Sequence, residues 1–109
     1  MSARDVYAAV SSVMPCAHMA FREGCAPELP WCVYYLDGVD GFAADNGFAA
    51  KKNSWVVEHY WRDYDEEKEA ALEKAIEETF GTYSKSEAWV DSERCCQTAY
   101  YFGEIESQR

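Results

Sequence analysis

The sequence predicts a single α+β domain, with a mostly antiparallel sheet of about four or five strands and an N-terminal helix and a second, acidic helix packed on one face. Two segments repeat apolar residues at helical spacing, and the second of them is rich in glutamate. Other segments are aromatic and β-branched, which is typical of strands. The length of 109 residues fits one domain, residues 1–109, and a hydrophobic content of 49% is sufficient for a core.

The N-terminal segment 2–14 has the pattern of a helix. Ser2 and Asp5 have the spacing of a capping box, apolar residues recur at three- and four-residue steps from Val6 onward, and Pro15 ends the segment.

The next segment, 15–30, contains three prolines and a glycine and is therefore expected to be irregular. We expect the large apolar residues Met19 and Phe21 to anchor it.

The middle of the chain carries two strand-like segments, 31–36 and 54–62. Glycines and polar residues predict turns at 38–41 and 51–53, with a short strand or arm within 42–50. Alternation in the segment 54–62 places four side chains on one face, namely Trp55, Val57, His59 and Trp61.

A second helix is expected to begin at Asp63, with Glu66 three residues on, and to end before Gly81. The acidic residues lie early in this helix, where the macrodipole favours them. The segments 86–92 and 96–105 then predict a closing pair of strands. The apolar side of the helix consists of Leu72, Ala75, Ile76 and Phe80.

The formal net charge is −10, from 20 acidic and 10 basic residues. Sites that bind phosphates need clustered Lys and Arg, so we expect no sequence-specific nucleic-acid partner and no membrane partner. The first residues do not resemble a signal peptide, and no stretch approaches the roughly 20 apolar residues of a membrane span. We therefore expect a soluble protein made in the cytosol. An acidic inhibitor that imitates DNA remains an alternative.

The chain has five cysteines, an odd number without a repeated spacing, so reduced and mostly buried thiols are expected. A zinc site formed by Cys16, His18, Cys25 and Cys32 is an alternative. Its spacing lacks the two short Cys-x-x-Cys-like pairs of structural zinc sites, so we expect no metal.

No enzyme signature is present. Asp45 and Asn46 stand side by side, but no base, nucleophile or third ligand accompanies them, so turn chemistry is expected. His59 lies between Val57 and Trp61 and is expected to be half-buried and hydrogen-bonded. We expect no catalytic activity and no cofactor, with a small metal-dependent or thiol enzyme as the alternative.

Aromatic residues are abundant, with 4 Trp, 8 Tyr and 5 Phe. A domain of this size buries only some of them, and exposed aromatic residues are typical of protein–protein contacts.

The order of these features resembles the tail terminator, or tail-completion, proteins at the head–tail junction of long-tailed phages. The resemblance spans nearly the whole chain and depends on the order of short motifs. The elements that carry it are PCAHMAF at 15–21, LPWCVYY at 29–35, FAADN at 42–46, WVVEHY at 55–60 followed by the acidic helix, and Glu93, Gln97 and Tyr101 in the closing strand.

This resemblance implies a virion structural protein that forms a ring, commonly a hexamer, at the neck–tail junction after assembly in the bacterial host cytoplasm. It implies contacts with identical subunits, the major tail tube protein and a neck or head-completion protein, with DNA passing through the ring. A head-closure or portal-side adaptor protein is the alternative within this class. The residues expected at the interface are Phe42, Asp45, Asn46, Phe48, Tyr60 and Trp61.

Overall fold

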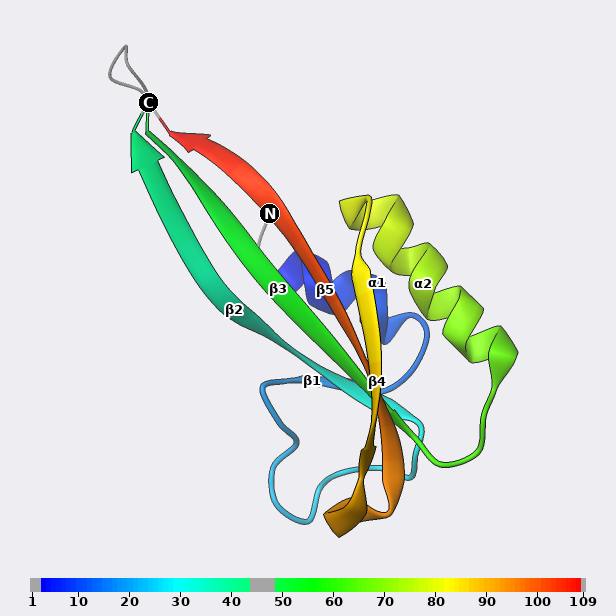
Figure 1. Cartoon of the computed structure of the whole chain (residues 1–109). Helices are drawn as coiled ribbons and strands as arrows, with labels where there is room; N and C mark the ends of the chain where they lie inside the picture. Colours follow the sequence, from blue (N-terminus) through cyan, green and yellow to red (C-terminus); the bar gives the residue numbers. More distant parts are fainter. Residues whose placement is uncertain (1–2, 44–48, 109) are drawn as a thin grey trace.

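The computed structural model describes residues 3–43 and 49–108 and contains two helices and one five-stranded sheet (Figure 1). This confirms the predicted α+β class. Within the described residues, no helix combines the length and the apolar character needed to span a bilayer. The elements are α1 (Ala3–Ser11), β1 (Cys16–His18), β2 (Trp31–Ala43), β3 (Ala49–Trp61), α2 (Glu66–Phe80), β4 (Ser84–Val90), a short 3-10 helix (Asp91–Glu93) and β5 (Cys95–Gln108).

The strands follow the order β1-β2-β3-β5-β4 across the sheet. Within the described residues, β1 and β2 pair in parallel, and the other three neighbouring pairs are antiparallel. The sheet is therefore mostly antiparallel, as predicted. The last strand of the chain, β5, lies between β3 and β4.

Both helices cover the same face of the sheet, because side chains from both enter one core. Val6 and Val10 of α1 and Leu72 and Ile76 of α2 are fully buried. The sheet contributes alternate residues of its three long strands, as expected for a half-covered sheet. These residues are Cys32, Tyr34, Trp55, Val57, Tyr100 and Phe102.

The predicted start of α2 was wrong by two residues. Asp65 is the N-cap, and its carboxylate accepts the Lys68 amide hydrogen at 3.1 Å. Asp63 instead belongs to the connection that leaves β3. The predicted end is confirmed, because Gly81 has a φ of 93° and its amide donates to the Glu77 carbonyl.

Strands β2, β3 and β5 continue beyond the helices as a three-stranded arm, made of residues 37–43, 49–54 and 103–108 (Figure 1). The molecule is elongated, with dimensions of 52 × 28 × 23 Å. The predicted turns at 38–41 and 51–53 were therefore wrong. The glycines of this segment lie within β2, which pairs with β3 on both sides of a bulge between Leu36 and Gly38. Asp40 faces Lys52 across the two strands.

The segment before β2 was predicted to be irregular, but it contains β1, which pairs with Cys32–Tyr34 of β2. Met19 does not anchor this segment, because it has a positive φ of 69° and is 62% exposed. Phe21 does, because its ring packs edge-on against Trp31 at 5.0 Å.

Candidate interaction surface

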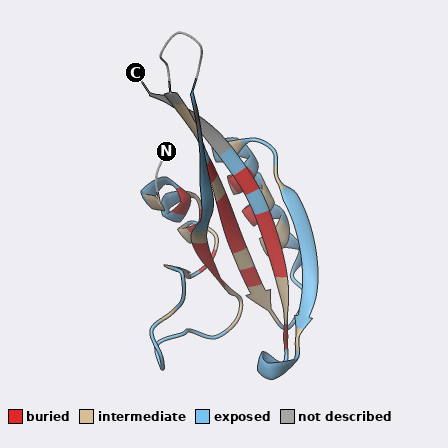
Figure 2. Cartoon of the chain, turned by 60° about the vertical axis from the view of Figure 1, so that its left-hand side comes forward, coloured by how far each residue is buried: buried red, intermediate tan, exposed pale blue. Residues whose placement is uncertain are grey.

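The face of the sheet opposite the helices carries the second side-chain set of each strand, and we call it the open face. Buried residues follow the central strands while β4 is exposed along its length (Figure 2). Val56 and Ala99 are buried on this face, and Val56 lies between Tyr35 and Tyr101 of the neighbouring strands. From β2, β3 and β5, strand alternation places on the open face Trp31, Val33, Tyr35, Val56, Glu58, Tyr60, Gln97, Ala99 and Tyr101.

A hydrogen-bonded network occupies the middle of the open face. The hydroxyls of Tyr35 and Tyr60 each donate to one carboxylate oxygen of Glu58, both at 2.8 Å. The Gln97 side-chain amide donates to the Tyr60 hydroxyl at 2.8 Å. Three neighbouring strands, β2, β3 and β5, supply these residues, so the network fixes their positions relative to one another.

The two tyrosines of this network resist ionisation. Burial and the hydrogen bond to Glu58 raise the pKa of Tyr35. Burial raises the pKa of Tyr60 to about 12; the bond from Gln97 opposes this shift and the bond to Glu58 adds to it. The open face therefore presents neutral phenols around one carboxylate.

Replacing Glu58 with Gln is expected to lower the pKa of Tyr60, because the charge that opposes its ionisation is removed. Alkaline titration of ring-labelled tyrosines by NMR measures this pKa directly. Glu87→Gln is the matched control, because this exposed residue of β4 makes the same charge change away from Tyr60. An unchanged Tyr60 pKa in Glu58→Gln would contradict the network.

One end of the open face is concave. Trp31 stacks at a tilt on Tyr60, with ring centroids 4.8 Å apart, and the loop that carries Phe21 lies beside them. A hollow of about 620 Å³ separates this loop from the sheet, and Arg22 and Arg62 also line it. This end combines aromatic surface with charges of both signs, because Glu23 and Glu93 line the hollow together with the two arginines.

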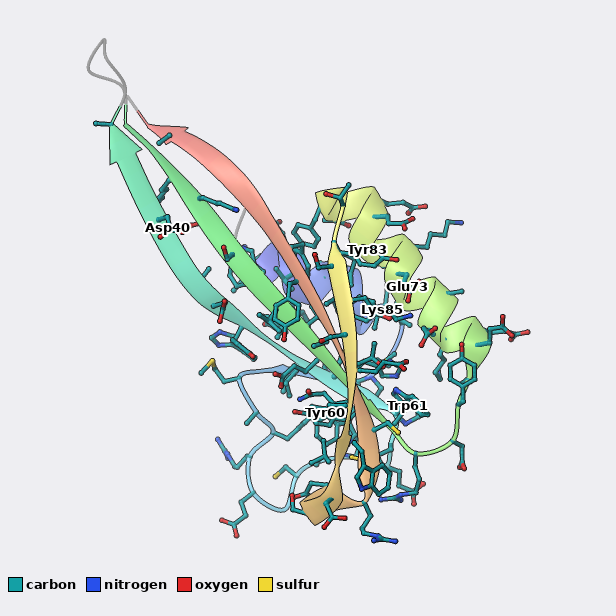
Figure 3. The ribbon with its side chains drawn as sticks, in the orientation of Figure 1. Asp40, Tyr60, Trp61, Glu73, Tyr83 and Lys85 are labelled. Atoms are coloured by element: carbon teal, nitrogen blue, oxygen red, sulfur yellow. The ribbon has the colours of Figure 1, made fainter. Side chains whose placement is uncertain are left out.

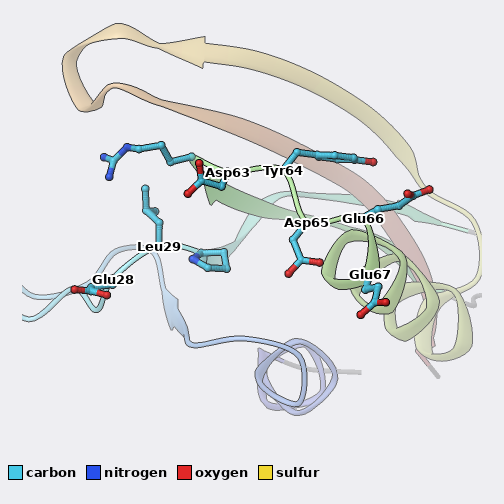
Figure 4. A pocket seen from close by; sticks show the side chains of 9 residues that line it. Glu28, Leu29, Asp63, Tyr64, Asp65, Glu66 and Glu67 are labelled. Atoms are coloured by element: carbon cyan, nitrogen blue, oxygen red, sulfur yellow. The ribbon is translucent and has the colours of Figure 1, made fainter.

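A second hollow, of about 720 Å³, lies beside the N-terminus of α2 (Figure 4). The side chains in it come from the loop before β2, from the connection between β3 and α2, and from the first turn of α2. Within the described residues, no group of three or more His, Cys, Asp or Glu side chains is placed to hold a metal ion. The residues that line this hollow are Glu28, Leu29, Pro30, Arg62, Asp63, Tyr64, Asp65, Glu66 and Glu67.

On the helix-covered side, α2 is attached to the sheet through a polar cluster (Figure 3). The Lys85 ammonium contacts Glu73 at 2.7 Å and Glu69 at 3.1 Å. The hydroxyls of Tyr83 and Tyr100 also donate to Glu73, at 3.1 and 2.8 Å. Burial opposes the charge on Glu73, but these donors hold its pKa below the ordinary value. The acidic face of α2 is therefore partly turned inward and not wholly solvated.

His59 was predicted to be half-buried and hydrogen-bonded, but it is buried, with 3% exposure. Neither ring nitrogen has a hydrogen-bond partner among the residues that the structure describes. Thr98 lies opposite His59, but its hydroxyl oxygen accepts from the Trp61 indole at 2.9 Å. Burial lowers the pKa of His59 to about 4, so the ring is neutral.

The structure separates the predicted interface residues. Tyr60 lies on the open face and Trp61 on the helix-covered face. Phe42 lies in the arm, opposite Ala50, at the other end of the β2–β3 pair. Three further predicted residues, Asp45, Asn46 and Phe48, lie outside the described residues.

Sequence reasoning did not find the network of Tyr35, Glu58 and Gln97. Alternation alone placed Glu58 beside Tyr60 on one face. The partners from the other two strands depend on strand order and register, which a single sequence does not contain.

The residues of the alternative zinc site are not assembled for that purpose. Cys16 and Cys32 lie opposite each other in β1 and β2, and Cys25 is exposed in the loop between these strands. The ring of His18 packs against Tyr34 at 5.2 Å.

The chain matches no protein-family model, and none of the curated proteins compared with it is significantly similar.

Proposed function

We propose that this chain is a structural protein of a phage virion, a tail terminator that forms a ring at the end of the tail tube and joins it to the neck. The observation that carries this proposal is the three-stranded arm. An uncovered sheet ribbon buries little of its own surface, so it gains most from a neighbouring subunit. Two exposed apolar side chains mark this surface. Leu36, at the base of the arm, is 41% exposed, and Val39, within the arm, is 49% exposed.

A ring requires heterologous contacts, in which one surface of each subunit meets a different surface of the next. The arm and the open face are two such surfaces. They lie on different parts of the molecule and share no residue among the open-face set defined above. The concave aromatic end beside Trp31 and Tyr60 suits a partner with apolar side chains, such as the arm with Val39.

Negative charge supports a role around DNA. The net charge of −10 gives a ring of such subunits a strongly acidic surface, and like charges prevent DNA from adhering as it passes. The exposed carboxylates Glu66, Glu67 and Glu78 lie on the outer side of α2.

Capping is tested by polymerising the major tail tube protein with and without this chain. We expect defined tubes that carry a terminal ring in electron micrographs and stop elongating. Tubes that elongate unchanged and carry no ring would overturn the proposal. A ring that forms only on the portal end of heads would instead support the head-closure alternative.

The arm is tested separately. Val39→Glu is expected to leave the free subunit folded, because the side chain is exposed, and to prevent the terminal ring. Met19→Glu is the matched control, because it makes the same change at a residue that is 62% exposed and lies outside the arm. Equal capping by both variants would show that the arm is not the contact.

A further inference from the structure

The outer edge of β4 is a regular row of backbone donors and acceptors without a strand partner in the described parts of the chain. The strand has seven residues and pairs with β5 without a register shift. Every residue from Ser84 to Trp89 is exposed. Figure 2 shows β4 as an exposed ribbon at the side of the sheet.

The other edges that the structure describes carry the usual protection against pairing. Strand β1 has only three residues. The outer edge of β2 in the arm has a bulge between Leu36 and Gly38 and carries Asp37 and Asp40. Short strands, bulges and charged side chains all discourage edge-to-edge contact. Strand β4 has no proline and no bulge.

The one lysine of β4 does not protect the edge, because it is held against α2. Its ammonium contacts Glu73 and Glu69 at 2.7 and 3.1 Å, and the side chain is 32% exposed. An ammonium has three donors, so one remains for a further acceptor. The residues on the opposite side of β4 are small, namely Ser84, Ser86 and Ala88.

We propose that β4 pairs antiparallel with β4 of a second copy, around a twofold axis at Ser86. A twofold axis perpendicular to the sheet keeps the helix-covered faces on the same side. Residues that face each other must then come from the same face of both strands. The two five-stranded sheets join into one continuous sheet.

Charge selects this register. With the axis at Ser86, Lys85 of each copy faces Glu87 of the other, so two pairs of opposite charge form. An axis at Lys85 places two lysines opposite each other, and an axis at Glu87 places two glutamates opposite each other. Ser86 is therefore the only one of these three centres that joins unlike charges.

The inference does not depend on the proposed ring. A twofold contact uses the same surface on both subunits, whereas a ring of one polarity uses two different surfaces. The contact uses the backbone edge of β4, which lies outside the arm and outside β2, β3 and β5. The dimer is a state of the free protein, and its test needs no tail component.

The first measurement is the mass of the full chain in reducing buffer, by light scattering and sedimentation over a concentration series. We expect a dimer of the 12.4 kDa chain that dissociates on dilution. Glu87→Lys makes both cross-strand pairs repulsive and is expected to raise the dissociation constant about tenfold. Glu23→Lys, an exposed loop residue, makes the same charge change and is expected to leave it unchanged.

The second measurement tests the register by crosslinking in a Cys25→Ser background, because Cys25 is an exposed thiol. Ser86→Cys is expected to give a covalent dimer on mild oxidation, since opposed residues of an antiparallel pair lie within disulfide range. Ser84→Cys is expected to give none, because in this register Ser84 faces Ala88 of the second copy. A monomer at every concentration, or crosslinking through Ser84 and not through Ser86, would overturn the proposal.

Discussion

Replacing Leu72 with Ala is expected to destabilise the domain by about 2–5 kcal/mol, because the side chain is fully buried and its removal leaves a cavity. Leu72 lies in the middle of α2 and enters the common core with α1 and the sheet. Natural domains have total stabilities of roughly 5–15 kcal/mol, so the loss is a large fraction of the total.

Urea unfolding followed by tryptophan fluorescence measures this loss. Lys74→Ala is the control in the same helix, because its side chain is 75% exposed and its contact with Glu78 is long, at 3.9 Å. The control is expected to change stability by about 0.5 kcal/mol or less. Equal losses in the two variants would mean that α2 is not packed as described.

Acid is expected to destabilise the protein through His59. In the unfolded chain the histidine has a pKa of about 6.5, but burial lowers it to about 4 in the fold. Between these pH values the unfolded state binds more protons than the folded state. The contribution of His59 to the free energy of unfolding is therefore complete above about pH 6.5 and is lost as the pH falls toward 4. The whole change is worth roughly 3 kcal/mol.

The charged groups around His59 do not compensate for this cost. Glu69 and Asp65 favour the protonated ring, and Lys68 and Lys85 oppose it, but burial is the largest effect. His59→Leu retains an apolar side chain at this buried position and is expected to remove the pH dependence above pH 5, where free carboxylates hardly titrate. Urea midpoints at several pH values compare the two proteins. Parallel curves for wild type and His59→Leu would exclude this role.

The fold class could be predicted because two periodicities are strong in this sequence. Apolar residues at helical spacing placed α1 and the core side of α2, where Leu72 and Ile76 are buried as expected. Alternation along 54–62 placed Trp55 and Val57 on the covered face of β3.

The length of the strands could not be predicted, because glycines that are typical of turns lie within segments that the structure pairs as strands. Gly38 and Gly41 are typical of a turn, yet β3 pairs with this part of β2 over its whole length. β1 has only three residues and depends on its contact with β2, so no pattern within the strand indicates it.

The polar network of the open face was equally beyond a single sequence. Glu58 joins Tyr35 from β2 and Tyr60 from its own strand, and Gln97 completes the network from β5. The ion pair that directs the Glu73 side chain toward the sheet was not predicted for a similar reason, because its partner Lys85 lies on β4 and not on α2.

The placement of β5 between β3 and β4 has a consequence for the order of folding. Strands β2 and β3 are neighbours in the chain and can pair early, whereas β5 must return across α2 and β4 to reach β3. Strands β4 and β5 are also neighbours in the chain and form a hairpin, and within the described residues β4 joins the sheet through β5 alone. The exposed edge of β4 is thus held to the rest of the sheet through the β3–β5 pairing, so a local opening between β3 and β5 would release β4 and β5 together as one hairpin.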